Sequence, residues 1–341
     1  MNILLIQLKR IGDLILTTPA IAAVREKFPD AEITLVISDD AAELMPALTG
    51  VNRILLMKRS IAGLGTLATI ASKRFDYCVD FTRNDRSAFL VLLSHARKRI
   101  VSFRIKVRSK FRTRFYNEFV EHRMRDMHTI DYHLALLEPL GIANASRAIQ
   151  LDLPQTAHEK AAQLRESFNL HKQFVVFHPG SARPEKFWDA RKWADVIEHA
   201  GQNHDVDLVL TGGVGLLERT HLQDIQSKLR RSIVDLSGKT DLLTLAALLA
   251  QARLLVTVDS APMHLAAATR TPQVILFGPT NPFHWRPRES PALILQGDSA
   301  SPITEFVPKQ PRIPMKQIST QAVINAMDSL LSKPAVQPSS S

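Results

Sequence analysis

The stretch "ILLIQLKRIGDLILTTPAIAAVREKFPDAEITLVI" (residues 3–37) decides the fold class. Apolar runs at 2–8 and 31–38 predict two buried strands, and helical spacing of apolar residues at 13–28 predicts the helix between them. A strand, a helix and a second strand in this order are typical of a parallel sheet. Asp13 follows Gly12 where the first strand gives way to the helix. The local sequence leaves open whether this carboxylate caps the helix or serves as a base in a reaction.

The alternation of strand and helix continues along most of the chain. Further strands are predicted at 53–58, 77–81, 98–103, 173–181 (running into a loop), 207–213, 233–238, 254–260 and 273–278, and further helices at 62–74, 86–96, 128–142, 189–203, 215–229, 241–251 and 262–269. This pattern predicts an α/β protein with two Rossmann-like, doubly wound domains that face a central cleft. We expect an N-terminal domain over 1–153, a linker region over 154–172 and a C-terminal domain over 173–318. A helix at 319–333 is expected to pack back on the N-terminal domain, and 334–341 to be a disordered tail.

Composition is that of a soluble globular protein. The 341 residues are 45% hydrophobic and 22% charged, and the chain is long enough for two domains of ordinary size. The single cysteine, Cys78, excludes an internal disulfide and fits a reducing compartment. The sequence shows neither a secretory signal nor an apolar window of membrane-spanning length, so we expect a cytoplasmic protein.

Positive charge is concentrated in the N-terminal half. The net charge is +10, and residues 1–150 carry 23 Lys and Arg against 15 Asp and Glu. Within this half, the segment 97–125 holds 11 Lys and Arg, two Glu and interleaved Phe and Tyr. Such segments are typical of nucleic-acid binders and of proteins that lie on anionic membranes, although a charge run is most often a solvated face. The density of charge favours an anionic partner.

Three strand-to-helix turns of the C-terminal half have features of a phosphate site. "VVFHPGSARPEKFW" (175–188) places Lys186 behind a Pro/Gly/Ser loop, and "VLTGGVGLLE" (209–218) places Glu218 behind a glycine turn. Each of these two is also compatible with an ordinary connection. "LLVTVDSAPMHLAAA" (254–268) is more informative, because helix capping explains Asp259 and Pro262 but not His264 at the positive end of the helix. The sequence contains neither the H-E-x-x-H motif nor a metal-binding Cys/His spacing, which argues against a metal site.

Taken in order, these motifs resemble glycosyltransferase family 9, the lipopolysaccharide heptosyltransferases. The resemblance is carried by the quoted N-terminal stretch, "FDYCVDFTRNDRSAFL", "HPGSARPEKFWDARKWADVI", "LTGGVGLLE", "LSGKTDLLTLAALLAQARLLVTVDSAPMHLAAA" and "FGPTNPFHWRP". It implies a GT-B fold and inverting transfer of a heptose from ADP-heptose to an anionic lipopolysaccharide inner-core acceptor. It also implies that no metal or other cofactor is required and that the protein contacts the inner face of the inner membrane peripherally. We expect no nucleic-acid partner.

The resemblance also implies roles for individual residues. Asp13 would be the general base. The donor would be bound by Ser181, Lys186, Glu218, Thr240, Leu242, Asp259, Ser260, Ala261 and His264, and the acceptor by Arg10, Arg86 and His128. Ala261 departs from the family pattern, which usually has glycine there, and this puts the closest approach of the backbone to the phosphate in question.

Two other functions remain compatible with the sequence. One is a GT-B transferase or epimerase that uses a UDP-sugar. The other is a nucleic-acid-binding protein built on residues 97–125, which would leave Asp13, Lys186 and the 259–264 segment unexplained. A Rossmann dehydrogenase is disfavoured because no G-x-G-x-x-G follows any predicted strand.

Overall fold

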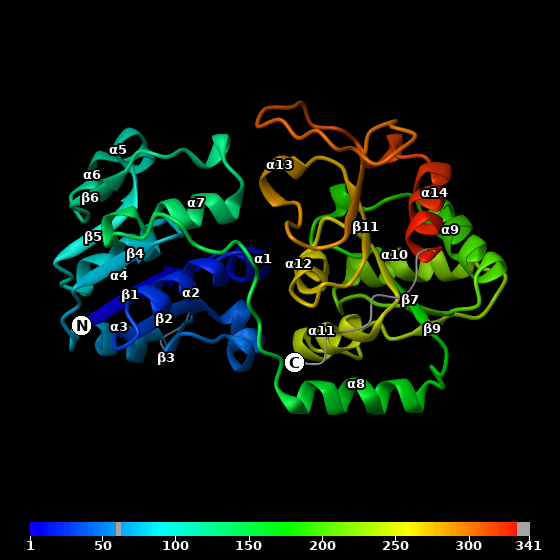
Figure 1. Cartoon of the computed structure of the whole chain (residues 1–341), viewed down its shortest axis with the longest axis horizontal. Helices are drawn as coiled ribbons and strands as arrows, with labels where there is room; N and C mark the ends of the chain where they lie inside the picture. The colour runs from blue at the N-terminus through cyan, green and yellow to red at the C-terminus, as the bar shows by residue number, and fades with distance from the viewer. Residues whose placement is uncertain (59–62, 333–341) are drawn as a thin grey trace. The chain divides into compact units, whose positions relative to one another are not determined.

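The computed structural model describes residues 1–58 and 63–332, which form two compact units that divide between Asp152 and Leu153 (Figure 1). We call residues 1–152 the first unit and the remainder the second unit. Three predicted features lie wholly or partly outside the described residues: the start of the helix at 62–74, the end of the helix at 319–333, and the tail at 334–341.

The first unit is built on a parallel sheet of six strands in the order β3-β2-β1-β4-β5-β6. The strands are β1 (Asn2–Gln7), β2 (Glu32–Ser38), β3 (Arg53–Met57), β4 (Tyr77–Asp80), β5 (Lys98–Ser102) and β6 (Glu118–Val120). The chain adds strands on one side of β1 and then continues from β4 on the other side. This is the Rossmann order, whose ligand position lies at the carboxyl ends of β1 and β4, where the order reverses.

The helices of the first unit cover this sheet. The α-helices are α1 (Ile11–Ile15), α2 (Thr18–Lys27), α3 (Leu64–Ala71), α4 (Asp85–Leu93), α5 (Arg104–Arg108), α6 (Lys110–Thr113) and α7 (Thr129–Ala135), and the 3-10 helices are η1 (Asp39–Ala47), η3 (Met124–Asp126) and η4 (Glu138–Leu140). Residues of α3, α4 and α5 share one hydrophobic cluster with Leu4, Ile6 and Cys78 of the central strands. Helices α2 and α7 pack against each other.

The second unit repeats the same topology, with strand order β12-β11-β10-β7-β8-β9. Its strands are β7 (Phe174–His178), β8 (Asp207–Leu210), β9 (Val234–Asp235), β10 (Leu254–Val258), β11 (Gln273–Phe277) and β12 (Ala292–Gln296). Its helices are α8 (Gln155–Ser167), η5 (Pro184–Lys186), α9 (Ala190–Asn203), α10 (Leu216–Ser227), α11 (Leu242–Gln251), α12 (Ala261–Ala268), α13 (Pro282–Trp285), η6 (Met315–Gln317) and α14 (Thr320–Leu331). The order reverses between β7 and β10.

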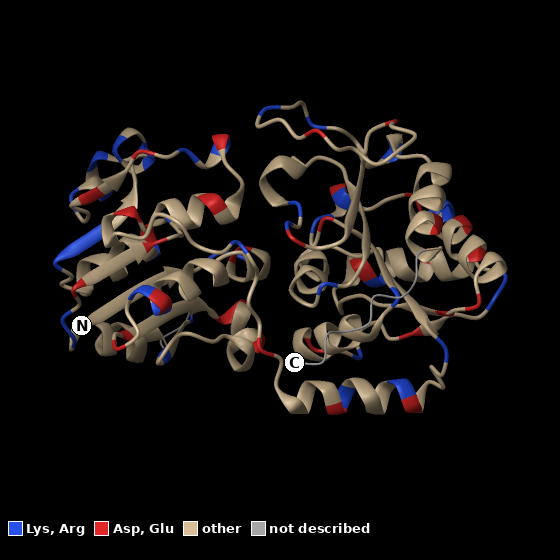
Figure 2. Ribbon diagram, in the orientation of Figure 1, with Lys and Arg blue, Asp and Glu red and all other residues tan. Residues whose placement is uncertain are grey.

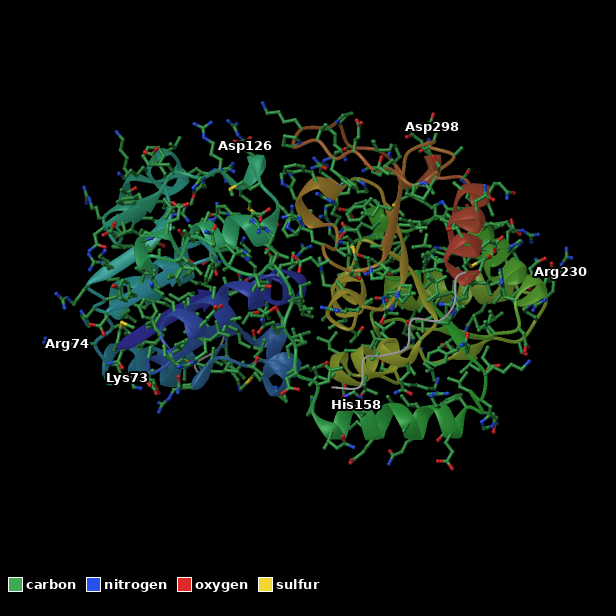
Figure 3. The ribbon with its side chains drawn as sticks, viewed as in Figure 1. Lys73, Arg74, Asp126, His158, Arg230 and Asp298 are labelled. Atoms are coloured by element: carbon green, nitrogen blue, oxygen red, sulfur yellow. The ribbon has the colours of Figure 1, made fainter. Side chains whose placement is uncertain are left out.

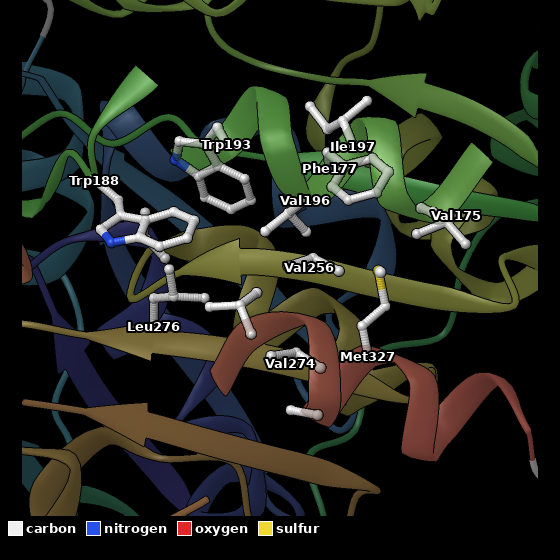
Figure 4. Close-up of a cluster of buried hydrophobic side chains, with 14 of the residues drawn as sticks. Val175, Phe177, Trp188, Trp193, Val196, Ile197, Val256, Val274, Leu276 and Met327 are labelled. Carbon is white, nitrogen blue, oxygen red and sulfur yellow. The ribbon is translucent and has the colours of Figure 1, made fainter. Parts of the chain in front are cut away.

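Alternate residues of β11 show how both faces of the second sheet are covered. Val274 and Leu276 pack in a cluster with α9, α10 and α14, whereas Ile275 and Phe277 pack with Met263 of α12. Because successive side chains of a strand point to opposite faces, α12 lies on the face opposite to α9 and α14. Figure 4 shows the larger cluster, in which Trp188 and Trp193 meet edge to face.

The last helix, α14, differs from the prediction. The sequence analysis places it against the N-terminal domain, but Val323, Ala326 and Met327 are buried in the hydrophobic cluster of the second unit (Figure 4). Helix α14 contacts α9 and strands β10, β11 and β12. It therefore completes the core of the unit that contains it.

Residues 154–172, expected to be a linker region, contain helix α8, which packs against α11. Ala157 and Ala161, one turn apart, are its buried residues, and the small side chains allow close packing. The predicted helix at 13–28 is interrupted. Pro19 lacks an N–H donor, and the hydroxyls of Thr17 and Thr18 donate to the carbonyls of Asp13 (2.7 Å) and Ile15 (2.8 Å).

In the described part of the chain, helices long and apolar enough to cross a membrane are absent.

Candidate active site

Asp13 lies in the first turn of α1, directly after the carboxyl end of β1. Its side chain is buried, and its Oδ1 has no hydrogen-bond partner among the described residues. Lys9 Nζ lies 3.5 Å from this oxygen, one helical turn earlier in sequence. Arg10 occupies the N-cap position and is exposed, and its carbonyl accepts from Leu14 N–H. Asp13 is therefore not the cap that the sequence left open.

Lys9 is the charged partner of this carboxylate. Burial lowers the pKa of the Lys9 ammonium, and the nearby Asp13 counteracts part of that effect. Beneath the pair, Thr17 Oγ1 accepts from Gln7 Nε2 at 2.8 Å and lies 3.2 Å from His133 Nδ1. Burial lowers the pKa of His133 to about 3, so this imidazole is neutral at physiological pH. Because the Thr17 hydroxyl also donates to the Asp13 carbonyl, it connects the turn that bears Asp13 to Gln7 and His133. The Lys9 ammonium is the opposite charge beside the Asp13 carboxylate.

A second carboxylate, Asp80 at the end of β4, organises the neighbouring turn. Its Oδ1 accepts from the backbone N–H groups of Thr82 (2.8 Å) and Arg83 (3.0 Å). Its Oδ2 accepts from the hydroxyls of Ser87 and Tyr116, both at 2.7 Å. These bonds hold Arg83 at φ 64°, a left-handed conformation that costs a non-glycine residue about 1 kcal/mol. Asp80 is therefore fully used by the fold.

The strained turn directs Arg83 into a pocket lined with arginine. The pocket has a volume of about 190 Å³ and is lined by Thr82, Arg83, Arg104, Ile105, Arg108 and Arg112. Arg83 lies 4.8 Å from the Tyr132 ring, and its buried Nε has no hydrogen-bond partner among the described residues. Burial lowers the pKa of Arg104, and the nearby guanidiniums of Arg108 and Arg83 lower it further.

Negative charge at this arginine pocket is scarce. Among the described residues, Asp85 is the one carboxylate in an ion pair with these arginines; it lies 3.3 Å from Arg112, and its side chain is 93% exposed. Figure 2 shows Lys and Arg recurring along α5 and α6. Thr82 also connects the pocket to the Asp13 segment, because its hydroxyl accepts from Leu8 N–H at 2.7 Å. Both features therefore belong to the same edge of the first sheet.

The other two residues expected to contact the acceptor are used within the fold. Arg86 is half-buried and donates from Nη2 to the carbonyl of Met57 at 2.9 Å. His128 is buried and occupies the N-cap position of α7, where Nδ1 accepts from Ile130 N–H at 3.2 Å. The roles in acceptor binding assigned to Arg10, Arg86 and His128 stay predictions.

In the second unit, Lys186 and Asp259 meet at the carboxyl ends of β7 and β10. Lys186 Nζ donates to Asp259 Oδ2 at 2.6 Å and to the Asp259 carbonyl at 2.8 Å. Both residues are buried. An ammonium has three N–H donors, and the two bonds to Asp259 are its hydrogen bonds among the described residues. The strand order reverses at this point, which is where α/β sheets bind ligands.

His264 lies in the first turn of α12, which begins after Ser260. It is buried, and its Nδ1 has no hydrogen-bond partner within the described ranges. Burial lowers the pKa of His264 to about 4, and the carboxylate of Asp259 and the ammonium of Lys186 act on it in opposite directions. Ser260 forms no side-chain cap, and Ala261 is half-buried as the first residue of α12. The helix start therefore holds an uncharged imidazole beside the positive end of the helix.

Glu218, in the first turn of α10, folds back on two glycine turns. Its Oε1 accepts from Gly213 N–H at 2.7 Å and lies 3.7 Å from His178 Nε2. A Cβ at Gly180 would lie 1.8 Å from the same oxygen, so a larger residue there would displace the Glu218 side chain. Burial lowers the pKa of His178 to about 4. Glu218 thus joins the turns that follow β7 and β8.

The remaining predicted donor residues lie in nearby loops. Ser181 follows Gly180, and its hydroxyl accepts from Arg183 N–H at 3.3 Å. Thr240 and Leu242 are half-buried and flank Asp241, which caps α11 by accepting from Thr244 N–H at 2.7 Å. Their predicted roles in binding the donor stay predictions.

Comparison with known proteins identifies the family. The family model described as "Glycosyltransferase family 9 (heptosyltransferase)" matches residues 66–311, more than half of the chain. The chain belongs to glycosyltransferase family 9. It is 27% identical over 285 residues to lipopolysaccharide heptosyltransferase 3 of Escherichia coli K12, covering 81% of this chain and 82% of that protein.

Two solved structures share the fold of this family 9 glycosyltransferase. A family 9 glycosyl transferase from Veillonella parvula matches with a TM-score of 0.84 and 25% identity, covering 97% of each chain. The E. coli ADP-heptose lipopolysaccharide heptosyltransferase II matches with a TM-score of 0.77 and 20% identity, covering 97% of this chain and 98% of that one. The predicted α/β class and GT-B fold are confirmed.

Sequence reasoning does not identify several residues of the candidate site. The sequence marks Lys9 only as a charge near Asp13, and its pairing depends on the turn geometry of α1. In the sequence, Arg83 appears only as one residue of the motif "FDYCVDFTRNDRSAFL". Its position depends on the turn in which its backbone N–H donates to Asp80 Oδ1. The arginine pocket gathers residues from the basic segment 97–125 around Arg83. The available signal in the sequence is a single arginine, Arg83, that closely follows the end of the strand predicted at 77–81.

Proposed function

We propose that this glycosyltransferase transfers a heptose from ADP-heptose to the inner core of lipopolysaccharide with inversion, without a catalytic metal, and with Asp13 as general base. The observation that carries the proposal is the buried Asp13 carboxylate, whose Oδ1 has no hydrogen-bond partner in the described part of the chain. The names of the relatives, a lipopolysaccharide heptosyltransferase and an ADP-heptose heptosyltransferase, support the substrate classes.

The surroundings of Asp13 suit a general base. A base needs an ionised carboxylate with a lone pair that no other donor occupies. Lys9 at 3.5 Å offsets the negative charge of the buried group, and no hydrogen-bond donor among the described residues occupies Oδ1. The short helix α1 and the Thr17 hydroxyl bond to the Asp13 carbonyl fix the position of the side chain. This supports a role in which the carboxylate takes up a proton during the reaction.

The residues at the carboxyl edge of the second sheet suit a diphosphate leaving group. Lys186 has one N–H donor beyond its two bonds to Asp259, and His264 has a buried nitrogen at the start of α12 that forms no hydrogen bond with the described residues. Such preorganised donors stabilise charge that develops as a bond to phosphate breaks. Glu218 is placed by Gly180 and Gly213 to accept from the hydroxyls of a ribose, as acids do in other nucleotide sites.

The proposed step is a single displacement. The acceptor hydroxyl oxygen forms a bond to the anomeric carbon of the heptose, and its proton passes to the Asp13 carboxylate. The bond between the anomeric carbon and the β-phosphate oxygen breaks, and ADP leaves with the electron pair. Attack opposite to the leaving group inverts the anomeric centre. The negative charge gained by ADP is met by Lys186, by an N–H of His264 and by the start of α12.

The arginine pocket supports an anionic acceptor. The pocket is lined by four guanidinium groups, and among the described residues one carboxylate, that of Asp85, forms an ion pair with them, so the positive charges outnumber the negative ones. Arg83 Nε is a buried donor without a hydrogen-bond partner among the described residues. Guanidinium forks bind carboxylates and phosphates through paired hydrogen bonds. Because Thr82 links the pocket to the segment that bears Asp13, we expect an acid group of the acceptor to bind here. We expect peripheral contact with the membrane surface on which such a lipid-linked acceptor lies.

A transfer assay tests the proposal. Purified enzyme is given ADP-heptose and a panel of truncated lipopolysaccharide acceptors, and the released ADP and the elongated product are measured. We expect transfer to at least one inner-core acceptor, and Arg104→Gln with Arg108→Gln to raise the KM for that acceptor while leaving the affinity for ADP unchanged. Thermal stabilisation by UDP and not by ADP would contradict the donor assignment. Equal turnover after chelation is expected for a reaction without a catalytic metal.

A further inference from the structure

Two histidines and an aspartate meet on the second unit, where α9 packs against α14. His199 lies near the end of α9, His204 follows that helix, and Asp328 lies on α14. His204 Nε2 is 2.7 Å from Asp328 Oδ1, and His199 Nε2 is 2.9 Å from Asp328 Oδ2. Among the described residues, this is the one group of three such side chains whose ligand atoms lie within 4.8 Å of one another.

We propose that His199, His204 and Asp328 form a binding site for a zinc ion. Two imidazole nitrogens and one carboxylate oxygen are a donor set that zinc accepts, with a water as the fourth ligand. The separation of the histidines by four residues falls within the spacing common in zinc sites. The predicted absence of metal motifs rested on sequence spacing alone, and Asp328 is 124 residues from His204.

For zinc, the two carboxylate contacts have to open, and the two imidazole nitrogens, which lie within 4.8 Å of each other, have to reach the edge length of a tetrahedron. With bonds of about 2.0–2.1 Å, the ligand atoms of a tetrahedral site lie about 3.3 Å apart. The two carboxylate contacts of 2.7 and 2.9 Å would open by roughly half an ångström to that separation. The three side chains are 20–35% exposed, so an ion and its bound water can enter from solvent.

Asn203 supplies a hydrogen-bond partner outside the ligand set. Its Nδ2 donates to the His199 carbonyl at 3.0 Å and lies 3.2 Å from His199 Nδ1. When Nε2 binds a metal, the ring proton resides on Nδ1, which then needs an acceptor. Rotation of the Asn203 amide places its oxygen there, at the expense of the bond to the carbonyl. Asn203 thus adjusts the tautomer of His199 to the bound ion.

Zinc at this position would join α14 to α9. Helix α14 buries Val323, Ala326 and Met327 in the cluster that α9 also covers. The ligands come from both helices, so binding ties the last helix to the core of the second unit. A ligand that binds only the folded state raises the free energy of unfolding by RT ln(1 + L/Kd), where L is the concentration of free ligand. The site therefore acts on stability, and its loss leaves the proposed transfer reaction intact.

Zinc binding to the full chain without an affinity tag tests the proposal. After dialysis against a chelator, calorimetric titration with zinc chloride at pH 7.5 is expected to show one equivalent. Saturating zinc is expected to raise the melting temperature by about 5 °C. His199→Gln and His204→Gln are each expected to abolish this binding, and Asn203→Ala to weaken it about 10-fold. His158→Gln is the matched control on α8 (Figure 3), with binding equal to wild type.

The zinc titrations of the wild type and its variants either support or overturn the proposed zinc site. Failure to bind one equivalent of zinc, or binding that survives both histidine substitutions, overturns the site and leaves two histidine–aspartate ion pairs. Near-ultraviolet circular dichroism establishes that each variant is folded. If a histidine variant is unfolded, the Asn203→Ala affinity decides instead, with an unchanged value counting against the site.

Discussion

Replacing Asp13 by asparagine separates its proposed role as base from its contribution to folding. Asparagine keeps the shape of the side chain and cannot take up a proton. General-base assistance is typically worth about 10²–10⁴-fold in rate, or about 3–5 kcal/mol in activation free energy. We expect turnover of Asp13→Asn to fall by that factor while the affinity for ADP changes little, because the residues that we propose to bind the donor lie in the second unit.

The structure sets a smaller cost for stability. At 3.5 Å and an effective dielectric constant of 20, the Lys9–Asp13 attraction is about 5 kcal/mol before desolvation. The desolvation of two largely buried charges offsets most of this, and helical ion pairs of this spacing contribute about 0.5 kcal/mol net. Asparagine removes the cost of burying the carboxylate charge but leaves the largely buried Lys9 ammonium without its charged partner. We therefore expect the unfolding free energy to fall by about 2 kcal/mol, less than for a fully buried pair because the Lys9 side chain is 23% exposed.

The assay compares kcat, the affinity for ADP and the urea midpoint in three proteins. Asp30→Asn, an exposed position between α2 and β2, makes the same chemical change and is expected to match wild type in all three. Wild-type turnover in Asp13→Asn would refute the base assignment. So would a fall in turnover that merely follows a comparable loss of folded protein, because the effect would then be structural.

Three further predictions concern the second unit. Lys186→Met is expected to weaken ADP binding at least 10-fold. It is also expected to lower the free energy of unfolding by about 3 kcal/mol, because it leaves the buried Asp259 carboxylate unpaired. An unchanged ADP affinity in calorimetry would exclude the proposed contact of Lys186 with the phosphates of ADP. Burial lowers the pKa of His178 and His264 from 6.5 to about 4, so below pH 6.5 the unfolded chain binds protons that the folded chain does not. Stability is therefore complete above that pH and falls by about 3 kcal/mol per histidine on descending to pH 4; urea midpoints independent of pH over this range would contradict it. Gly180→Ala is expected to displace Glu218 and to weaken ADP binding about 10-fold, and an unchanged affinity would show that the position of this carboxylate does not matter for the nucleotide.

The strands and helices at the centre of each unit were predictable from the sequence, because the strands are apolar and the apolar residues of the helices recur with helical spacing. Strands such as β1 and β10 are buried throughout or nearly so and read as continuous apolar runs, as expected for parallel sheets covered on both faces. The edge strand β6 escaped prediction because it has three residues and begins with Glu118 inside a basic segment. Helix α8 escaped because its buried face consists of two alanines, which give almost no hydrophobic signal.

The site shows a different limit. Strand ends predicted Asp13, Lys186 and Asp259, because the carboxyl ends of parallel strands meet at one edge. The pairing of Lys186 with Asp259 could not be derived from local sequence, since 73 residues separate them and a 3-10 turn turns the lysine inward. The arginine pocket likewise depends on a left-handed Arg83, which no propensity favours.

Asp13 illustrates how structure decides between two interpretations that sequence leaves open. A capping carboxylate accepts from backbone N–H groups of its own helix and has no free lone pair toward a ligand. Asp13 lies inside the first turn, Arg10 takes the cap position without a side-chain bond, and the carboxylate faces Lys9. Asp80 lies at the corresponding end of β4, and both of its carboxylate oxygens accept hydrogen bonds within the fold. The donors are two backbone N–H groups of the following turn and the hydroxyls of Ser87 and Tyr116. Of these two carboxylates, Asp13 is the one with an oxygen that has no hydrogen-bond partner among the described residues, as our proposal for a base requires.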